Sequence, residues 1–312
     1  MHDSNTGTRW RLAAPRYWHT WLGLAMLWLL AQTPYRFQLW LGRGLGRAML
    51  RIAPGRRHVA ETNIRLCFPQ LSTKEQDRLL RRNFESTAIA LLETGIAWFW
   101  PKWRLRRLVS IEGLEHIEQA RDRGKLLLAM HMTTLDICAA LLNLYVPVDG
   151  VYRAHKNPVF DFVQYRGRSR VNPAARIYPR EQVRTFVNAL REKRLLWYAP
   201  DQNYRGKHSV FVPFFGVPAA TTTATSSVVS LGHAVVIPFT HTRRADGRGY
   251  DLKIHPPWTD FPSGDERADT RTVMQFIERQ VALHPEQYLW VHRRFKTQPD
   301  GAPSPYLQVQ NG

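Results

Sequence analysis

The amino-acid sequence predicts an α/β protein with a mixed sheet flanked by helices. Short apolar runs at 109–112, 125–130 and 195–199 alternate with longer segments of helical periodicity. Such alternation is typical of sheets whose connecting helices cover both faces. The hydrophobic fraction of 44% in 312 residues is enough for one large core or two smaller ones.

The first 54 residues differ from the rest and predict an N-terminal membrane-anchor helix followed by a basic amphipathic helix. Segment 17–31 is apolar but short of the about 20 residues that a full span needs. Whether it spans a membrane or lies in the membrane plane stays open. In 37–52, apolar residues recur at helical spacing while arginines line another face. This pattern favours a helix at an anionic membrane interface over an ordinary core helix, and we expect residues 55–312 to form the globular domain.

The remaining elements follow from capping signals, prolines and periodicity. Ser72 and Glu75 form a capping box that opens a helix to about Trp98. Asn157 and Pro158 provide the N-cap and the first residue of another helix. We expect further helices at 113–123, 135–144, 181–193, 221–230 and 267–283, and strands at 109–112, 125–130, 148–153, 195–199, 234–240 and 250–254.

Charge is the outlier of the composition. The chain carries 44 basic and 25 acidic residues, a net charge of +19, which predicts an anionic partner such as lipid, phosphorylated substrate or nucleic acid. The charge is spread along the chain without a nucleic-acid motif, so we expect no nucleic-acid partner. The two cysteines, Cys67 and Cys138, form no CxxC and predict a reducing compartment. We see no cluster with metal-ligand spacing and expect no metal site.

The segment KLLLAMHMTTLD contains the most informative pair, His131 and Asp136. The spacing by itself is a weak signal, because it occurs three times in the chain. Context distinguishes His131, which follows a short aliphatic strand and precedes a helical pattern. The other two pairs lie in a charged turn and next to two prolines, respectively: His241 with Asp246, and His255 with Asp260.

His131 and Asp136 could meet around the start of a helix. On a continuous helix they would point roughly 140° apart. They approach each other if His131 lies in the turn after the strand and Asp136 in the first helical turn, with Thr133 or Thr134 as the cap. In this interpretation Asp136 orients His131, which acts as the base that deprotonates a hydroxyl group.

Several segments together resemble the late acyltransferases of lipid A biosynthesis, the lauroyl/myristoyl acyltransferase family. The His131 segment is also similar to the H-x4-D/E box of glycerolipid acyltransferases. The family commonly carries glutamate where this chain has Asp136. The matching segments, in the expected order around the His131 box, are ETGIAWFWP (93–101), VYRAHKNPVFDFVQYRGRSR (151–170), LWYAPDQNYRGKHSVFVPFFGVPAATTTATS (196–226) and QYLWVHRRFKTQPDG (287–301).

The resemblance implies a glycerolipid-acyltransferase-like fold in which residues 55–312 are the catalytic domain. It further implies an enzyme of the bacterial inner membrane whose active site faces the cytoplasm. Such an enzyme transfers an acyl chain from acyl carrier protein to a hydroxyacyl chain of an anionic glycolipid, a Kdo-lipid A precursor. Acyl-acyl carrier protein is then the donor substrate, and no cofactor is implied.

Further site residues follow from the matching segments. Arg168 matches a functionally important arginine of the family and could hold a phosphate or support an oxyanion. Asp201 ends the strand WYAPD, at the edge where α/β sheets place ligands, and its family counterpart is also functionally important; it could bind a sugar or orient a basic residue. The candidates for anion contacts are Arg153, Arg170, Arg293, Arg294 and Lys296.

Two other functions fit part of the sequence. One is an acyltransferase of the same superfamily that acts on a lysophospholipid or another glycolipid. The other is a non-enzymatic basic protein that binds membrane or nucleic acid. That second alternative explains the net charge of +19, but it gives no reason for a histidine at the end of a strand with Asp136 and Asp201 after it.

Overall fold

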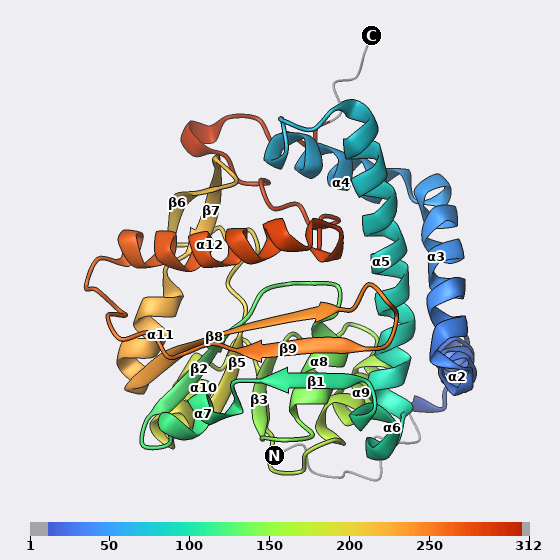
Figure 1. The fold of residues 1–312 in the computed structure, drawn as a ribbon, viewed down its shortest axis with the longest axis horizontal. Coiled ribbons are helices and arrows are strands. Elements are labelled where there is room, and N and C mark those ends of the chain that lie inside the picture. Colours follow the sequence, from blue (N-terminus) through green and yellow to red (C-terminus); the bar gives the residue numbers. More distant parts are fainter. Residues whose placement is uncertain (1–11, 308–312) are drawn as a thin grey trace.

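A seven-stranded mixed sheet forms the centre of the fold in a computed structural model, which describes residues 12–307 (Figure 1). The strand order is β1-β9-β8-β2-β5-β3-β4, and neighbours are parallel except β8 and β9. The predicted mixed sheet is therefore confirmed. The strands are β1 (Val109–Glu112), β2 (Gly124–Leu128), β3 (Val148–Tyr152), β4 (Ile177–Pro179), β5 (Leu195–Tyr198), β8 (Ala234–Arg243) and β9 (Tyr250–Ile254).

Side-chain alternation gives the sheet two buried faces. In β2, Leu126 and Leu128 belong to one apolar cluster, and Leu127 belongs to the other. Helices α10, α11 and α12 contribute to the first cluster, while α8, α9 and the end of α5 contribute to the second. These helices are α5 (Thr73–Phe99), α8 (Leu135–Leu142), α9 (Pro158–Ser169), α10 (Val183–Arg191), α11 (Ala224–Gly232) and α12 (Glu266–Leu283).

Three strands were not predicted from the sequence. β4 has three residues, and β6 (Ser209–Phe214) and β7 (Val217–Thr222) form a separate antiparallel hairpin. Because Thr221 and Thr222 pair with β6, the helix predicted at 221–230 begins three residues later, in α11. Two short helices, α6 (Lys102–Arg106) and α7 (Leu114–Gln119), flank β1.

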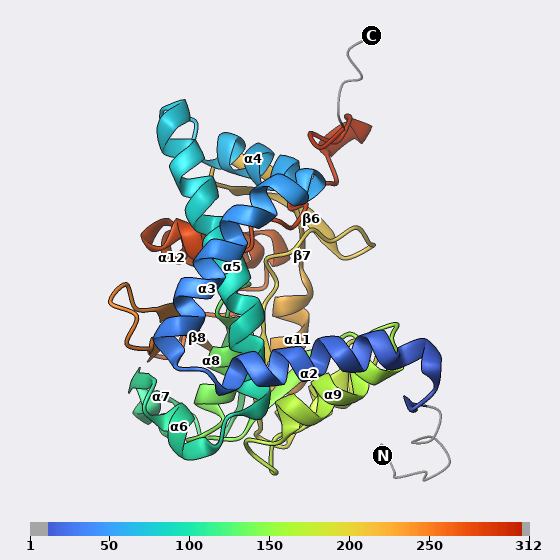
Figure 2. The ribbon, with the colours of Figure 1, turned by 90° about the vertical axis from the view of Figure 1, so that its right-hand side faces the viewer.

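The N-terminal helices pack along one side of the molecule (Figure 2). They are α2 (Trp18–Gln32), α3 (Tyr35–Ile52) and α4 (Pro54–Cys67). Helix α3 lies against α5, and its glycines allow the close approach. A Cβ atom at Gly46 would lie 2.5 Å from the backbone of α5, and one at Gly42 would lie 2.6 Å from Ile89 Cγ1.

Among the helices of residues 12–307, none combines the length and the apolarity needed to cross a membrane. Helix α2, in the segment expected to anchor the chain, has 15 residues. The predicted N-terminal membrane anchor is thus not supported as a membrane span, which was one of the two arrangements left open for segment 17–31. The domain boundary at residue 54, which coincides with the start of α4, stays a prediction.

Candidate active site

His131 lies three residues beyond the end of β2, at the edge of the sheet where the parallel strands end. The neighbouring parallel strand β5 ends at Tyr198 and brings Asp201 to the same edge. Asp201 accepts two hydrogen bonds from His131, one from the backbone N–H at 2.9 Å and one from the ring Nδ1 at 2.6 Å. The side chain of Asp201 is fully buried, while that of His131 is 26% exposed. The arrangement fixes the ring and leaves part of it accessible.

The structure corrects the partner that we predicted for His131. Asp136, in the first turn of α8, accepts hydrogen bonds from Arg168 Nε at 3.0 Å and Nη2 at 2.6 Å. The predicted pairing of Asp136 with His131 is therefore wrong. The reason is the strand order. Because β5 lies directly beside β2, the carboxylate of Asp201, which follows β5, reaches both the backbone and the ring of His131. Asp136 instead faces α9.

The charge of Asp201 determines the protonation of His131. Burial disfavours the imidazolium, but the carboxylate and its hydrogen bond outweigh burial and raise the pKa of His131. Burial alone would raise the pKa of Asp201, but the interactions with His131 lower it to about 2. An ionised carboxylate accepts, so Nδ1 carries the proton in the neutral ring and Nε2 keeps its lone pair. This is the state that a general base requires.

Three further residues near the dyad were missed in the sequence. Tyr288 donates a hydrogen bond of 3.4 Å to the backbone carbonyl of Asp201, and the backbone N–H of Asn203 donates to His292 Nε2 at 3.3 Å. Burial, together with nearby His131, lowers the pKa of His292 to about 4, so His292 stays neutral. Tyr288 and His292 lie within the segment 287–301 quoted above, which was the available signal for them.

A buried polar network holds the turn that follows His131. Glu93 on α5 accepts two hydrogen bonds from Arg243 on β8, at 2.5 and 2.6 Å. Arg243 Nη1 donates to Ser86 at 2.9 Å, and the hydroxyl of Ser86 lies 2.8 Å from that of Thr133. The backbone N–H of Thr133 also donates to the carbonyl of Gln287 at 2.7 Å. The turn is thus tied to α5, to β8 and to the segment after α12.

The predicted basic patch is divided by burial. Arg294 is 1% exposed, so its predicted role as a surface contact for an anion is wrong. It donates to the carbonyl of Ala220 at 2.8 Å and to Thr221 Oγ1 at 2.6 Å, and so holds the β6–β7 hairpin. Two aromatic residues of the same segment, Trp290 and Phe295, are also fully buried.

The other basic candidates differ in their surroundings. Arg170 donates a hydrogen bond of 2.7 Å to the backbone carbonyl of Trp100 and thereby ties the end of α9 to the end of α5. Arg153, Arg170, Arg293 and Lys296 are all exposed, as an anion contact requires.

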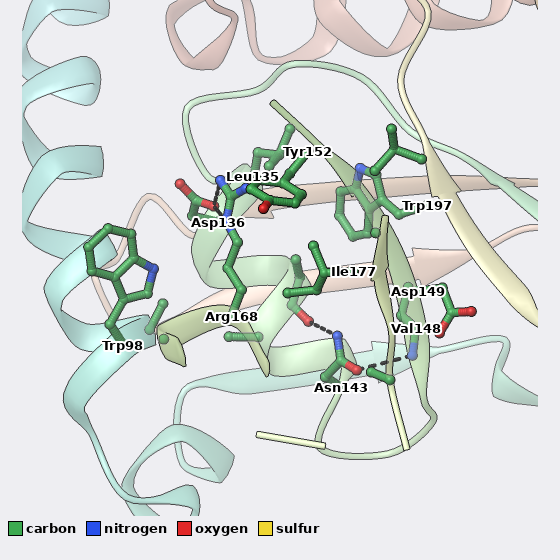
Figure 3. A pocket seen from close by; sticks show the side chains of 17 residues that line it. Trp98, Leu135, Asp136, Asn143, Val148, Asp149, Tyr152, Arg168, Ile177 and Trp197 are labelled. Atoms are coloured by element: carbon green, nitrogen blue, oxygen red, sulfur yellow. Dashed lines mark hydrogen bonds and ion pairs between the residues drawn. The ribbon is translucent and has the colours of Figure 1, made fainter. Parts of the chain in front are cut away.

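An apolar pocket of about 90 Å³ lies beside the Asp136–Arg168 pair (Figure 3). Helices α5, α8 and α9 and strands β3, β4 and β5 enclose it. The Asp136–Arg168 pair and Tyr152 lie at one end, and Asn143 and Val148 lie at the other. The pocket therefore has a fixed guanidinium at one end and an apolar interior, which suits the binding of an apolar group.

Comparisons with known proteins point to one family of acyltransferases. The sequence model of the family described as bacterial lipid A biosynthesis acyltransferase matches residues 5–297. The chain is 42% identical over 298 residues to the lipid A biosynthesis lauroyltransferase of Escherichia coli K12, covering 95% of this chain and 97% of that protein.

Two other proteins of the same bacterium are also similar along nearly their whole length. Identity to the lipid A biosynthesis palmitoleoyltransferase is 40% over 296 residues, covering 94% of this chain and 96% of the relative. Identity to the lipid A biosynthesis myristoyltransferase is 29% over 297 residues, covering 94% and 91%. The names of these relatives refer to different acyl groups.

Proposed function

This chain belongs to the bacterial lipid A biosynthesis acyltransferase family, and on that premise we propose that it transfers an acyl chain from acyl carrier protein to a hydroxyacyl chain of a Kdo-lipid A precursor. Family membership makes it an O-acyltransferase of lipid A biosynthesis. The donor, the acceptor hydroxyl and the roles of individual residues are the proposal. The observation that carries it is the His131–Asp201 dyad at 2.6 Å, with one ring nitrogen held and the other available.

In the proposed reaction, His131 Nε2 removes the proton of the acceptor hydroxyl as its oxygen attacks the thioester carbonyl. Asp201 keeps the ring in the required tautomer and stabilises the imidazolium that forms. The tetrahedral intermediate then collapses, so that a C–O ester bond replaces the C–S bond. His131 returns its proton to the departing thiolate. The step is balanced without a covalent acyl-enzyme and without a cofactor.

Arg168 is the group that we propose to face the negative charge of the substrate or of the developing oxyanion. Asp136 holds its guanidinium through two hydrogen bonds, and both side chains are about 30% exposed. A guanidinium fixed in advance stabilises charge without reorganisation when the charge forms. Asp136 is then a positioning residue rather than the partner of His131.

The Arg168→Lys variant is expected to lower kcat by about 10²-fold, because a lysine cannot reproduce the forked contact with Asp136. The matched control is Arg166→Lys, at an exposed position of the same helix, which should keep normal turnover. Steady-state kinetics with purified donor and acceptor measure both variants. Wild-type kcat in Arg168→Lys would contradict the assignment.

Acyl transfer should lose rate as the pH falls through the raised pKa of His131, because the base must be neutral. In the Asp201→Asn variant the carboxylate charge is absent, so burial dominates and the pKa of His131 falls. We expect the acidic limb of the kcat/KM profile to move to lower pH and the plateau rate to drop, since the imidazolium is no longer stabilised. An acidic limb at the same pH in both proteins would refute the dyad.

The acceptor is tested by exchange. With acyl-acyl carrier protein as donor, mass spectrometry should detect the acylated product from a Kdo-lipid A precursor and none from lysophosphatidic acid. Transfer to lysophosphatidic acid alone would favour the related acyltransferase activity on lysophospholipids. If neither acceptor is acylated, the proposed acyl transfer is overturned.

We further propose that the exposed faces of α2 and α3 rest on the cytoplasmic surface of the inner membrane. Large apolar side chains of both helices are exposed, and exposed arginines lie among those of α3. This composition is that of a helix held at an anionic interface by its apolar side chains and cations together. The exposed apolar residues are Trp18, Trp21, Leu22, Met26, Trp28, Leu29, Phe37, Trp40, Leu45 and Ile52.

The side chain of Trp40 is 66% exposed in the protein and would be buried in the membrane interface. The Trp40→Asp variant loses this apolar burial and should bind anionic phospholipid vesicles at least about tenfold more weakly. The control is Leu283→Asp, which changes a side chain of 68% exposure at the end of α12. Vesicle co-sedimentation measures both. Equal losses in the two variants, or none in Trp40→Asp, would rule out this face.

A further inference from the structure

The apolar pocket beside Arg168 owes its space to a glycine in the middle of a row of side chains. Gly150 on β3 is in register with Trp197 on β5 and with Ile177 on β4. Residues in register on adjacent strands point to the same face of a sheet. The row across three strands is therefore Trp197, Gly150, Ile177, with a gap where the central side chain would be. A Cβ atom built on Gly150 meets nothing within 4 Å.

The helices above this row add to the space because they present small residues. The lining includes Ala97 of α5, Ala139 and Ala140 of α8, and Gly167 of α9. Helices α9 and α5 approach closely at Gly167, since a Cβ atom there would lie 2.4 Å from Trp98 Cγ. The pocket is thus a gap that small residues leave between well-packed elements.

Polar groups at the inner end of the pocket are occupied by the protein itself. Asn143 donates to the carbonyl of Ala139 at 3.0 Å and accepts from the N–H of Val148 at 3.0 Å. Asp149 is fully buried and accepts from Arg194 and Tyr178. Asn143 and Asp149 therefore have their polar groups paired within the protein, and the partly exposed ionic pair Asp136–Arg168 lies at the other end of the pocket.

We propose that this pocket holds the acyl chain of the donor and that Gly150 determines which chain lengths fit. The inference rests on the proposed acyl transfer and specifies its donor selectivity. The thioester end lies at the Asp136–Arg168 end, and the methyl end points along β3 toward Val148. The five residues of β3 cover about 13 Å. An acyl chain of medium length would therefore lie along β3 and pass Gly150. A side chain at 150 would project into its path.

Substitution at Gly150 is compatible with the local backbone. Gly150 lies within a β-strand, its φ is outside the left-handed region, and the space over its Cα is open. Valine suits a strand and adds bulk directly into the pocket. Ile177→Ala makes the opposite change, because it removes bulk from the neighbouring position of the same row.

The test measures product composition from an equimolar mixture of acyl-carrier-protein donors of different chain lengths, with a lipid A precursor as acceptor. Gly150→Val should lower the ratio of long-chain to short-chain product by at least about tenfold, the discrimination expected when a pocket loses room for a methylene group or more. Gly150→Ala should give a smaller shift in the same direction, and Ile177→Ala should raise the ratio. The control, Gly55→Val, fills open space at the exposed start of α4 and should leave the ratio unchanged.

The outcomes separate this inference from the proposed function. If the wild-type protein transfers no acyl group to the precursor, the proposed function fails. If the wild-type protein transfers acyl groups but the product ratio is the same in all variants, the pocket assignment alone is overturned. An equal loss of all chain lengths in Gly150→Ala and Ile177→Ala, with unchanged melting temperatures, would also overturn it. Should Gly150→Val fail to fold, the opposite shifts in these two milder variants remain decisive.

Discussion

Replacing His131 with alanine is expected to lower the rate of acyl transfer by about 10²- to 10⁴-fold, the contribution of a general base. The variant should fold, because the ring is 26% exposed and its backbone N–H can still donate to Asp201. The expected change is in kcat, since His131 acts on the proton and not on the binding of the acyl chain. Single-turnover measurements with acyl-acyl carrier protein would isolate this step.

The matched control for His131→Ala is His116→Ala. His116 lies on α7, and its hydrogen bond to Gln119, at 3.2 Å, is at the surface. This variant should keep normal kcat. Thermal unfolding of both proteins would verify that the fold is retained. Transfer by His131→Ala at even a tenth of the wild-type rate would exclude His131 as the base.

Replacing Glu93 with alanine is expected to destabilise the fold by about 3–5 kcal/mol, because it leaves the buried guanidinium of Arg243 without its counter-charge. The side chains of Glu93 and Arg243 are 2% and 8% exposed. Tyr250 also loses a partner, since its hydroxyl donates to Glu93 at 2.5 Å. Urea unfolding followed by circular dichroism measures the free energy of unfolding.

Comparison with a surface pair tests whether burial causes the loss. Arg57 and Glu61 lie 2.6 Å apart, but their side chains are 51% and 39% exposed. Glu61→Ala should therefore change the free energy of unfolding by less than about 0.5 kcal/mol. If Glu93→Ala and Glu61→Ala had equal effects, the buried pair would not contribute as argued.

The network around Glu93 connects stability to the active site. Arg243 donates a hydrogen bond to Ser86, and the hydroxyl of Ser86 forms a hydrogen bond with that of Thr133, two residues after His131. A Glu93→Ala protein that still folds should therefore show a lower kcat as well, because the turn after His131 loses part of its support. Glu93 opens the segment ETGIAWFWP that carried part of the family resemblance, and this contact is a physical reason for that residue.

Periodicity and capping were sufficient to predict the elements next to His131 and Arg168. The strand ending before His131 and the helix starting near Asp136 are present as β2 and α8. The N-cap at Asn157 accepts hydrogen bonds from the backbone of α9 as expected. Such features depend on neighbours in the chain, so the sequence contains the information needed to place them.

Contacts between distant residues were not predictable in the same way. The strand order places Asp201, 70 residues away in the chain, against His131, and it leaves Asp136 to Arg168. Likewise, Arg294 lies in a run of basic residues that is typical of a surface. In the structure Arg294 is buried, together with Trp290 and Phe295. No pattern in the neighbouring residues distinguishes the buried Arg294 from the exposed Arg293.

The sequence by itself was sufficient to predict the α/β class and the family, and to single out His131, Arg168 and Asp201 as candidate site residues, because motif order and local periodicity are properties of the chain. The tertiary structure alone decided which carboxylate serves His131, and it decided that Gly150 leaves a gap between Trp197 and Ile177. Both depend on which strands become neighbours. That choice is made by the burial of whole elements against one another, and no single segment encodes it.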